Sequence, residues 1–339
     1  MTEIAYFSTA FFATTFGVVI FRRLARDSKF IDIPNERSSH VNPTLRGGGI
    51  VIVLVCLSLY LIAATSLGFQ FSLPYLAGAV LISVVSMIDD HRSLSVPVRL
   101  SVHLTAASIL VFSADPLPGI YFPFLGTAVI LGPAASVIGV LWVVWMINAY
   151  NFMDGIDGIA GAQAVASGAC WAVFGYIFSI PVYSYLGGIL LFSALGFLVH
   201  NWRPASVFMG DVGSAFLGYT FAAMPFIENN ASRQARTYLW LASLAFLWMF
   251  VADSVYTFIR RSLQGQKVWQ AHRQHVYQRL LLKGYGHDKV ALIYGVAALV
   301  IGTSIIFGSF IHIFTEWIPI AAAIAIPLAL AIWAERKKV

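Results

Sequence analysis

The chain has 339 residues, of which 59% are hydrophobic and only 11% are charged, and its mean hydropathy is +0.80. Soluble proteins carry roughly 25% charged residues, so this chain has too few charges to cover a water-facing surface of its size. The composition excludes a soluble enzyme, a disordered chain and a nucleic-acid-binding domain, and it favours a polytopic helical membrane protein. The apolar runs are long and unbroken rather than alternating, which argues against a membrane barrel.

Stretches without Asp, Glu, Lys or Arg recur along the whole chain. A helix needs roughly 20 residues to cross the hydrocarbon core, and prolines and glycines divide the two longest stretches. The sequence therefore predicts an all-α integral membrane protein with one polytopic domain over residues 1–339 and about 11 spans. These are expected at 4–21, 47–67, 74–89, 97–114, 126–147, 159–178, 182–200, 212–228, 238–259, 290–310 and 317–334.

Lys and Arg concentrate in every second connecting segment. With the N-terminus outside, 19 of the 21 basic residues fall on the inner side, and the positive-inside rule favours that orientation. The pattern predicts a periplasmic N-terminus and a cytoplasmic C-terminus. Cytoplasmic loops are expected at about 22–46, 89–99, 148–158, 200–211 and 260–289.

Five carboxylates lie at the predicted cytoplasmic ends of spans: Asp89, Asp90, Asp154, Asp157 and Asp211. Such a group repels itself unless a cation compensates, and Mg²⁺ takes carboxylate oxygens and shares them with substrate phosphates. The pattern predicts a metal-dependent site for a phosphorylated substrate at the inner surface. A single Asp such as Asp211 can also be a helix N-cap, and acids at the interface can simply be solvated.

Four polar residues follow one another at intervals of three after the fifth span: Asn148, Asn151, Asp154 and Asp157. Residues i and i+3 are neighbours on a helix, so this spacing predicts a slanting polar ridge that extends the span out of the membrane. The two glycines in the segment favour a loosened helix end and a close approach by a ligand.

Two of the predicted cytoplasmic loops contain an arginine next to glycines or histidine. Arg46 precedes three glycines, and Arg273 lies two residues before His275. These side chains are expected to bind an anionic substrate, with topology and attraction to acidic lipid as the alternative explanation. His272 and His275 are a poor zinc site because no cysteine or third histidine accompanies them.

A few chemically notable side chains fall inside or near the predicted spans. Asp253 is a costly intramembrane carboxylate and therefore suggests function, but the sequence assigns it no role. His103 and His312 are expected to be structural. Cys56 and Cys170 are expected to be small buried apolar residues.

The ordered motifs resemble those of the polyprenyl-phosphate N-acetylhexosamine-1-phosphate transferases of glycosyltransferase family 4. That family includes the phospho-MurNAc-pentapeptide transferase and the GlcNAc-1-phosphate transferases that start O-antigen synthesis. The matching segments are residues 37–40 with 43–48, Asp89-Asp90 with Leu94, Ser95 and Arg99, residues 148–158, Asn201 with residues 204–205 and 208–214, and residues 273–275.

The resemblance implies a reaction at the cytoplasmic face of the bacterial inner membrane. Undecaprenyl phosphate would attack the β-phosphorus of a UDP-N-acetylhexosamine in the presence of Mg²⁺ or Mn²⁺, and UMP would leave. Direct attack is favoured over a covalent aspartyl intermediate, because the lipid phosphate is already largely ionised. Membrane lipid is the expected surrounding partner, nucleic acid is not a partner, and a homodimer is one expected arrangement.

The resemblance also implies roles for individual residues. It places Asp211 and Asn151 on the metal and the catalytic pair Asp89 and Asp90 beside the attacking lipid phosphate. The substrate-binding residues it implies are Asn148, Asp154, Asp157, Asn201, Arg46, Arg99, Arg273 and His275.

Some alternatives stay open at this stage. Many family members carry further histidines after the position of His275, whereas Tyr277-Gln278-Arg279 stands here. Residues 271–280 look like the O-antigen branch that uses 6-deoxy sugars, so UDP-N-acetylfucosamine and UDP-N-acetylquinovosamine are alternative donors, and no evident peptide site favours the MurNAc-pentapeptide. A cation-coupled transporter would instead cluster its acids near the bilayer midplane. A CDP-alcohol phosphotransferase would need Asp-Gly-x-x-Ala-Arg, which is absent.

Overall fold

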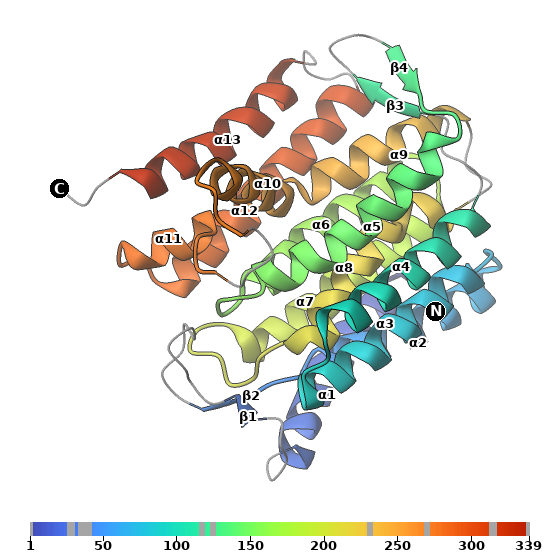
Figure 1. Ribbon diagram of the computed structural model, residues 1–339. Helices are drawn as coiled ribbons and strands as arrows, with labels where there is room; N and C mark the ends of the chain where they lie inside the picture. The colour runs from blue at the N-terminus through green and yellow to red at the C-terminus, as the bar shows by residue number, and fades with distance from the viewer. Residues whose placement is uncertain are drawn as a thin grey trace.

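The computed structural model describes residues 3–25, 31–32, 43–114, 119–122, 127–228, 233–267, 272–311 and 317–336, and helices dominate it (Figure 1). The long helices are α1 (Glu3–Leu24), α2 (Ile50–Leu67), α3 (Leu73–Arg92), α4 (Val96–Ser113), α5 (Ala134–Met153), α6 (Ile159–Ile177), α7 (Pro181–Asn201), α8 (Gly210–Ile227), α12 (His287–Ile305) and α13 (Trp317–Glu335). Shorter elements are α9 (Arg233–Phe246), α10 (Trp248–Leu263), α11 (Val276–Leu282), a π-helical turn η2 (Ile306–Phe310), and the strands β1 (Ile31–Asp32), β2 (Thr44–Leu45), β3 (Gly119–Phe122) and β4 (Thr127–Ile130).

Helix α8 lies at the centre of the bundle. It packs against α5 and α3 over most of its length, and against α2, α4, α6 and α9 over shorter stretches. Every residue of α8 except Asp211 is buried. Because Gly and Ala recur along α8, neighbouring helices can approach it closely, as small residues allow in membrane bundles.

The structure confirms a mostly helical protein with membrane-spanning helices. By length and apolar composition, eight of the described helices can cross a bilayer, or up to nine when the pair α9 and α10 is one span. Helices α6 and α8 fall outside that set. Both are largely buried in protein, so they need less apolar surface than helices that face lipid. The count of eleven spans stays a prediction.

The predicted start of the fifth span at residue 126 is wrong. Thr127–Ile130 form strand β4, which pairs antiparallel with β3 in the register Gly119 with Ile130. Gly132 has a φ of +52° and Pro133 precedes the helix, so α5 begins only at Ala134. The absence of charge cannot separate a strand from a helix, which explains the error.

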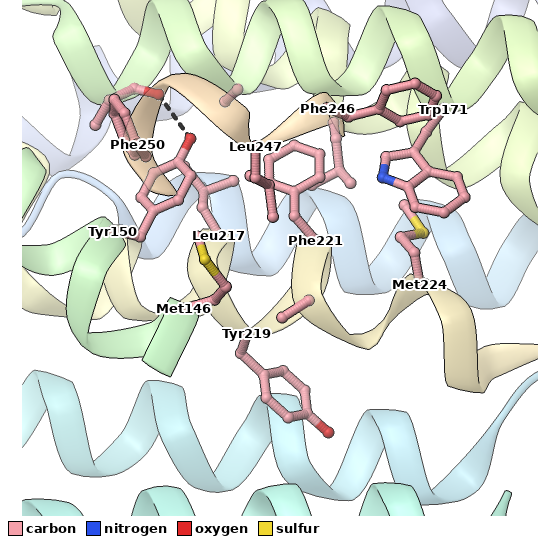
Figure 2. Close-up of a cluster of buried hydrophobic side chains, with 14 of the residues drawn as sticks. Met146, Tyr150, Trp171, Leu217, Tyr219, Phe221, Met224, Phe246, Leu247 and Phe250 are labelled. Carbon is pink, nitrogen blue, oxygen red and sulfur yellow. Dashed lines mark hydrogen bonds between the residues drawn. The ribbon is translucent and has the colours of Figure 1, made fainter. Parts of the chain in front are cut away.

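A sharp bend separates α9 from α10, whose axes differ by 74°. The bend lies against α5, α6 and α8, where Phe250 packs on Tyr150 and Phe246 packs on Trp171 (Figure 2). The broken helix leaves the Phe246 carbonyl free, and two polar side chains of α6 donate to it: Gln163 at 2.9 Å and Ser167 at 2.7 Å. A helix can break inside a membrane only where such groups are satisfied by protein.

Candidate active site

The first turns of α2 and α8 lie side by side at one end of the bundle. The amides of Gly48 and Gly49 donate to the carbonyls of Phe208 and Met209 at 3.0 and 2.9 Å. A Cβ atom on Gly49 would lie 2.4 Å from the Cα of Gly213, so only glycine permits this approach. Two helix N-termini therefore face the same region, and their dipoles favour an anion there.

Asp90 of α3 holds the start of α8 in place. Its carboxylate accepts the amides of Asp211 at 2.9 Å and Val212 at 3.0 Å, so it acts as an N-cap supplied by another helix. Arg46 Nε contacts the same carboxylate at 2.8 Å, and the Asp90 side chain is fully buried. These contacts occupy Asp90 with positioning rather than exposing it to a substrate.

Two arginines connect the acidic residues. Arg46 pairs with Asp211 as well as with Asp90. Arg99 pairs with Asp89 at 2.9 Å and lies 3.9 Å from Asp211. Burial alone would lower the pKa of Arg46, but the charges of Asp211 and Asp90 raise it above its ordinary value. Asp89 and Asp90 of α3 and Asp211 of α8 therefore gather at one place, joined by two arginines.

Two cavities meet at this cluster. The polar cavity, about 280 Å³ in volume, is lined by Asp32, Arg46, Asp154, Asp157 and His287, among others. The interhelical cavity, about 550 Å³, lies between α3, α4 and α5 and includes Asp89, Arg99, His103, Asn148 and His275 in its lining. Asn151 and Asp211 line both cavities. Groups bound in the two cavities would thus meet at these two residues.

The two acids of the polar cavity have opposite electrostatic environments. Burial raises the pKa of Asp154 well above its usual value, and the charges of Asp211, Asp90 and Asp157 add to this effect while Arg46 opposes it. Burial also acts on Asp157, but the hydrogen bond and charge of His287 and the amide of Ala205 lower the pKa of Asp157 instead. Asp154 is therefore the carboxyl in this cavity that most lacks a cation.

The polar ridge predicted over residues 148–157 is only half helical. Asn148 and Asn151 lie on α5, Asp154 caps its end, and Asp157 lies in the turn before α6. Asn148 contacts His103 Nδ1 at 3.2 Å, and Asn151 donates to Ser214 at 3.1 Å. Because α5 ends at Met153, the third member lies at the helix cap and the fourth lies beyond the helix.

Asn201 lines the polar cavity but is occupied by the backbone. Its Oδ1 accepts the Gly158 amide at 3.0 Å, and its Nδ2 donates to the Val207 carbonyl at 2.9 Å. Gly158 has a φ of +80°, and the bond from Asn201 holds it in the turn that begins α6. With both ends of its side chain bonded to the backbone, Asn201 stabilises the loops that form the cavity wall.

The other residues predicted for the site do not all line a cavity. His275 lines the interhelical cavity, whereas Arg273 is half-buried nearby and is not among the lining residues of either cavity. The motif over residues 37–40 lies outside the described residues. Of the acidic pair in α3, Asp89 lines the interhelical cavity and Asp90 does not.

Sequence reasoning missed two histidines. His287 Nδ1 lies 3.5 Å from an oxygen of Asp157, and His103, expected to be only structural, lines the interhelical cavity beside Asn148. His287 begins α12 beside Asp288, so its place at a helix start in a basic loop was an available signal. No local pattern distinguishes His103 from a packed residue.

The residues present suit a hard divalent cation. The side chain of Asp154 forms neither a hydrogen bond nor an ion pair with another described residue, while Asp211 and Asn151 offer oxygens beside it. Within the described ranges, no three His, Cys, Asp or Glu side chains already converge on one point. Such an ion would therefore complete its shell with the Asn151 amide oxygen, water or substrate phosphate, as Mg²⁺ commonly does.

The fold and the site together define a multi-pass membrane protein with an acidic, arginine-bridged cluster at one end of its helices. Residues 72–228 match the family described as "Glycosyl transferase family 4". This range runs from the start of α3 to the end of α8 and includes most of the cluster.

Similar proteins share more than this range. A decaprenyl-phosphate N-acetylglucosaminephosphotransferase of Mycobacterium tuberculosis is 31% identical over 88% of this chain and 81% of its own length. A probable undecaprenyl-phosphate N-acetylglucosaminyl 1-phosphate transferase of Bacillus subtilis is 28% identical, over 87% and 84%. An undecaprenyl-phosphate α-N-acetylglucosaminyl 1-phosphate transferase of Escherichia coli K12 is 26% identical, over 91% and 84%. The chain belongs to this family of polyprenyl-phosphate sugar-1-phosphate transferases.

Proposed function

We propose that this membrane transferase moves N-acetylhexosamine 1-phosphate from a UDP-sugar to undecaprenyl phosphate. An oxygen of the lipid phosphate attacks the β-phosphorus, the bond from that phosphorus to the bridging oxygen breaks, and UMP leaves. The observation that carries the proposal is the meeting of two cavities at Asn151 and Asp211. Transfer between two substrates requires such a shared point, because phosphoryl transfer depends mainly on positioning and charge neutralisation.

The composition of each cavity suggests which substrate it takes. The interhelical cavity lies between helices that face lipid and is lined by Val96, Leu100 and Ile147 beside the charged pair Asp89 and Arg99. That mixture suits a phosphate at the end of an apolar chain. The polar cavity suits a hydrophilic nucleotide sugar.

The charge of the polar cavity supports a requirement for Mg²⁺ or Mn²⁺. Four carboxylates line it, against one arginine and His287. A diphosphate would be repelled by this surplus of negative charge unless a cation entered with it. Asp211, Asn151 and Asp154 would hold the ion, which would neutralise the phosphates. Arg46 and Arg99 remain near the reacting groups to balance the other carboxylates.

We further propose the bacterial inner membrane as the location, with the site facing the cytoplasm. The loops richest in Lys and Arg lie at the same end of the bundle as the site. The positive-inside rule assigns that end to the cytoplasm. The acids lie at helix ends rather than at a midplane, which disfavours a cation-coupled transporter.

For the donor, UDP-N-acetylglucosamine is the first choice, because the names of the three relatives specify N-acetylglucosamine. Tyr277, Gln278 and Arg279, the residues that depart from the usual histidines, line neither cavity. The hydroxyl of Tyr277 donates to the Phe152 carbonyl, and Arg279 pairs with Glu335 on α13. A role in starting O-antigen or another envelope polysaccharide follows from the same product.

The direct test is UMP release by purified protein from a panel of UDP-sugars with undecaprenyl phosphate and Mg²⁺. The panel includes UDP-N-acetylglucosamine and the two 6-deoxy donors. We expect release with at least one donor, and its loss when the metal is chelated. No release with any of these donors would refute the proposal, and release that persists in chelator would refute the metal requirement.

Asp211→Asn tests the shared point of the two cavities. The variant should lose at least about 100-fold in activity. It removes the negative charge that pairs with Arg46 and that would bind the metal. The matched control is Asp288→Asn, an exposed acid at the same end of the bundle that lies 3.7 Å from Arg203. Equal activity in the two variants would exclude Asp211 from the reaction.

A further inference from the structure

Asp253 is a buried carboxylate of α10 that belongs to neither cavity wall of the proposed site. Its Oδ1 accepts hydrogen bonds from the Val276 amide at 3.0 Å and the Thr257 hydroxyl at 3.1 Å, and it lies 3.0 Å from His275 Nδ1. Its Oδ2 accepts from the Tyr277 amide at 3.2 Å and the Tyr294 hydroxyl at 2.6 Å. Five groups from three helices and a loop thus converge on one side chain.

These partners determine the tautomer of His275. Each oxygen of Asp253 faces a backbone N–H, which can only donate, so the carboxylate is an acceptor on both sides. A lone pair on His275 Nδ1 would be repelled by this carboxylate at 3.0 Å. Nδ1 therefore carries hydrogen, and Nε2 is the nitrogen whose hydrogen bond remains available.

The ring of His275 is held firmly in that orientation. It contacts the rings of His272 and Tyr277, with centroid distances of 4.9 and 5.8 Å. The amide of His275 donates to the Gln278 side chain at the start of α11. His275 lines the interhelical cavity, and its Nδ1 faces Asp253.

We propose that Asp253 is a positioning residue that presents His275 Nε2 to a phosphate group in the interhelical cavity. The inference rests on the proposed function, because that function places a phosphate beside Arg99 and Asp211, which line the same cavity. In many active sites, a carboxylate bonded to one ring nitrogen of a histidine orients the ring, so that the other ring nitrogen points at the substrate or metal. Asp253 itself does not touch the substrate.

Asp253 also caps α11, so the test must separate positioning from folding. We compare Asp253→Asn, His275→Gln and the double variant by kinetics of UMP release with varied lipid phosphate. Each single variant should lose roughly 10–100-fold in kcat with a smaller change in KM. The kcat of the double variant should be no lower than the kcat of the less active single variant, because both substitutions remove the same interaction. Losses that multiply, or wild-type kcat in Asp253→Asn, would overturn the proposal.

Tyr294→Phe is the comparator for stability. It removes a hydrogen bond from Asp253 Oδ2 and leaves the His275 contact in place. Its Tm in detergent should fall as in Asp253→Asn while it keeps most of its kcat. If its kcat falls as far as that of Asp253→Asn at equal loss of Tm, the role of Asp253 is only structural.

A spectroscopic measurement on the wild-type protein tests the tautomer of His275 directly. Its result depends neither on the stability of a variant nor on the proposed reaction. Nitrogen-15 NMR of histidine-labelled protein, with the His275 signal assigned through His275→Gln, should show Nδ1 protonated. An Nε2–H neutral tautomer would overturn the proposal. Failure of the wild-type protein to release UMP would instead refute the proposed function and leave the tautomer as measured.

Discussion

At the level of single residues, Asp154 and Asp157 show how three positions of separation change the chemistry of a carboxyl group. The side chain of Asp157 gains His287 and the Ala205 amide as partners, whereas the side chain of Asp154, at the end of α5, has no hydrogen bond or ion pair to another described residue. Burial therefore raises the pKa of Asp154, whereas the partners of Asp157 outweigh burial and lower its pKa.

Asp154 should make the stability of the metal-free protein fall as pH rises. Its unfolded-state carboxyl ionises above about pH 3.9, while the folded protein keeps the proton to a higher pH. Between those two pKa values the folded state binds more protons, so the free energy of unfolding decreases with pH. We expect the Tm of the wild type, relative to Asp154→Asn in chelator, to fall from acidic to alkaline buffer.

Mg²⁺ should restore the Tm of the wild type most at alkaline pH, where Asp154 can ionise, and it should affect Asp154→Asn less. Asp288→Asn is the control, because its carboxylate is exposed. A Tm difference between wild type and Asp154→Asn that is independent of pH would contradict the raised pKa of Asp154.

At the level of elements, the site depends on helix ends that other helices hold in place. Asp90 of α3 caps α8, and Asn201 of α7 fixes the start of α6. The bend between α9 and α10 is fixed by Gln163 and Ser167 of α6, which satisfy the carbonyl that the bend exposes. Helix α10, which begins directly after this bend, carries Asp253.

Removing the donors at the bend should destabilise the protein in steps. Ser167→Ala leaves Gln163 as a partner for the Phe246 carbonyl and should cost about 1 kcal/mol of unfolding free energy. Adding Gln163→Leu leaves a buried carbonyl unsatisfied, and about 1–3 kcal/mol more should be lost. Thermal unfolding in detergent measures both, and UMP release should fall with the second step.

Ser304→Ala is the matched control for these variants, because its hydroxyl donates only within its own helix, to Ile301 at 2.8 Å. We expect its Tm to stay close to that of the wild type. If the double variant at the bend is as stable as Ser304→Ala, the two side chains do not hold the bend.

At the level of the whole molecule, the ends of many helices meet at one end of the bundle. Contacts of Arg46 with Asp90 and Asp211 join the segment before α2 to α3 and α8, and contacts of His287 with Asp157 join the turn before α6 to α12. The β3–β4 hairpin lies at the opposite end (Figure 1). The arrangement separates a charged end from an apolar body.

The orientation in the membrane can be tested with single cysteines. Cys56 and Cys170 are buried, so background labelling should be low. In bacterial spheroplasts, an impermeant maleimide should label Ser113→Cys, at the far end of α4, and should label Ser262→Cys, at the end of α10, only after lysis. Both serines are exposed in the structure. The reverse pattern would place the site outside the cytoplasm.

The sequence by itself determined the class of protein, the position of most helices and the residue types of the site. Low charge and long apolar runs leave only a helical membrane fold, since unsatisfied backbone cannot face lipid. Asp89, Asp154, Asp157 and Asp211 were recognisable because carboxylates gathered at one membrane face repel each other unless a cation compensates.

Only the tertiary structure decided which of these residues face a substrate and which support the others. Asp89 and Asp90 are adjacent in the chain, yet one lines a cavity and the other caps α8. The local sequence pattern also could not predict the hairpin before α5 or the partners of Asp253. Side-chain roles depend on what packs against each rotamer, and helices distant in the chain supply those contacts, so periodicity and spacing cannot reveal them.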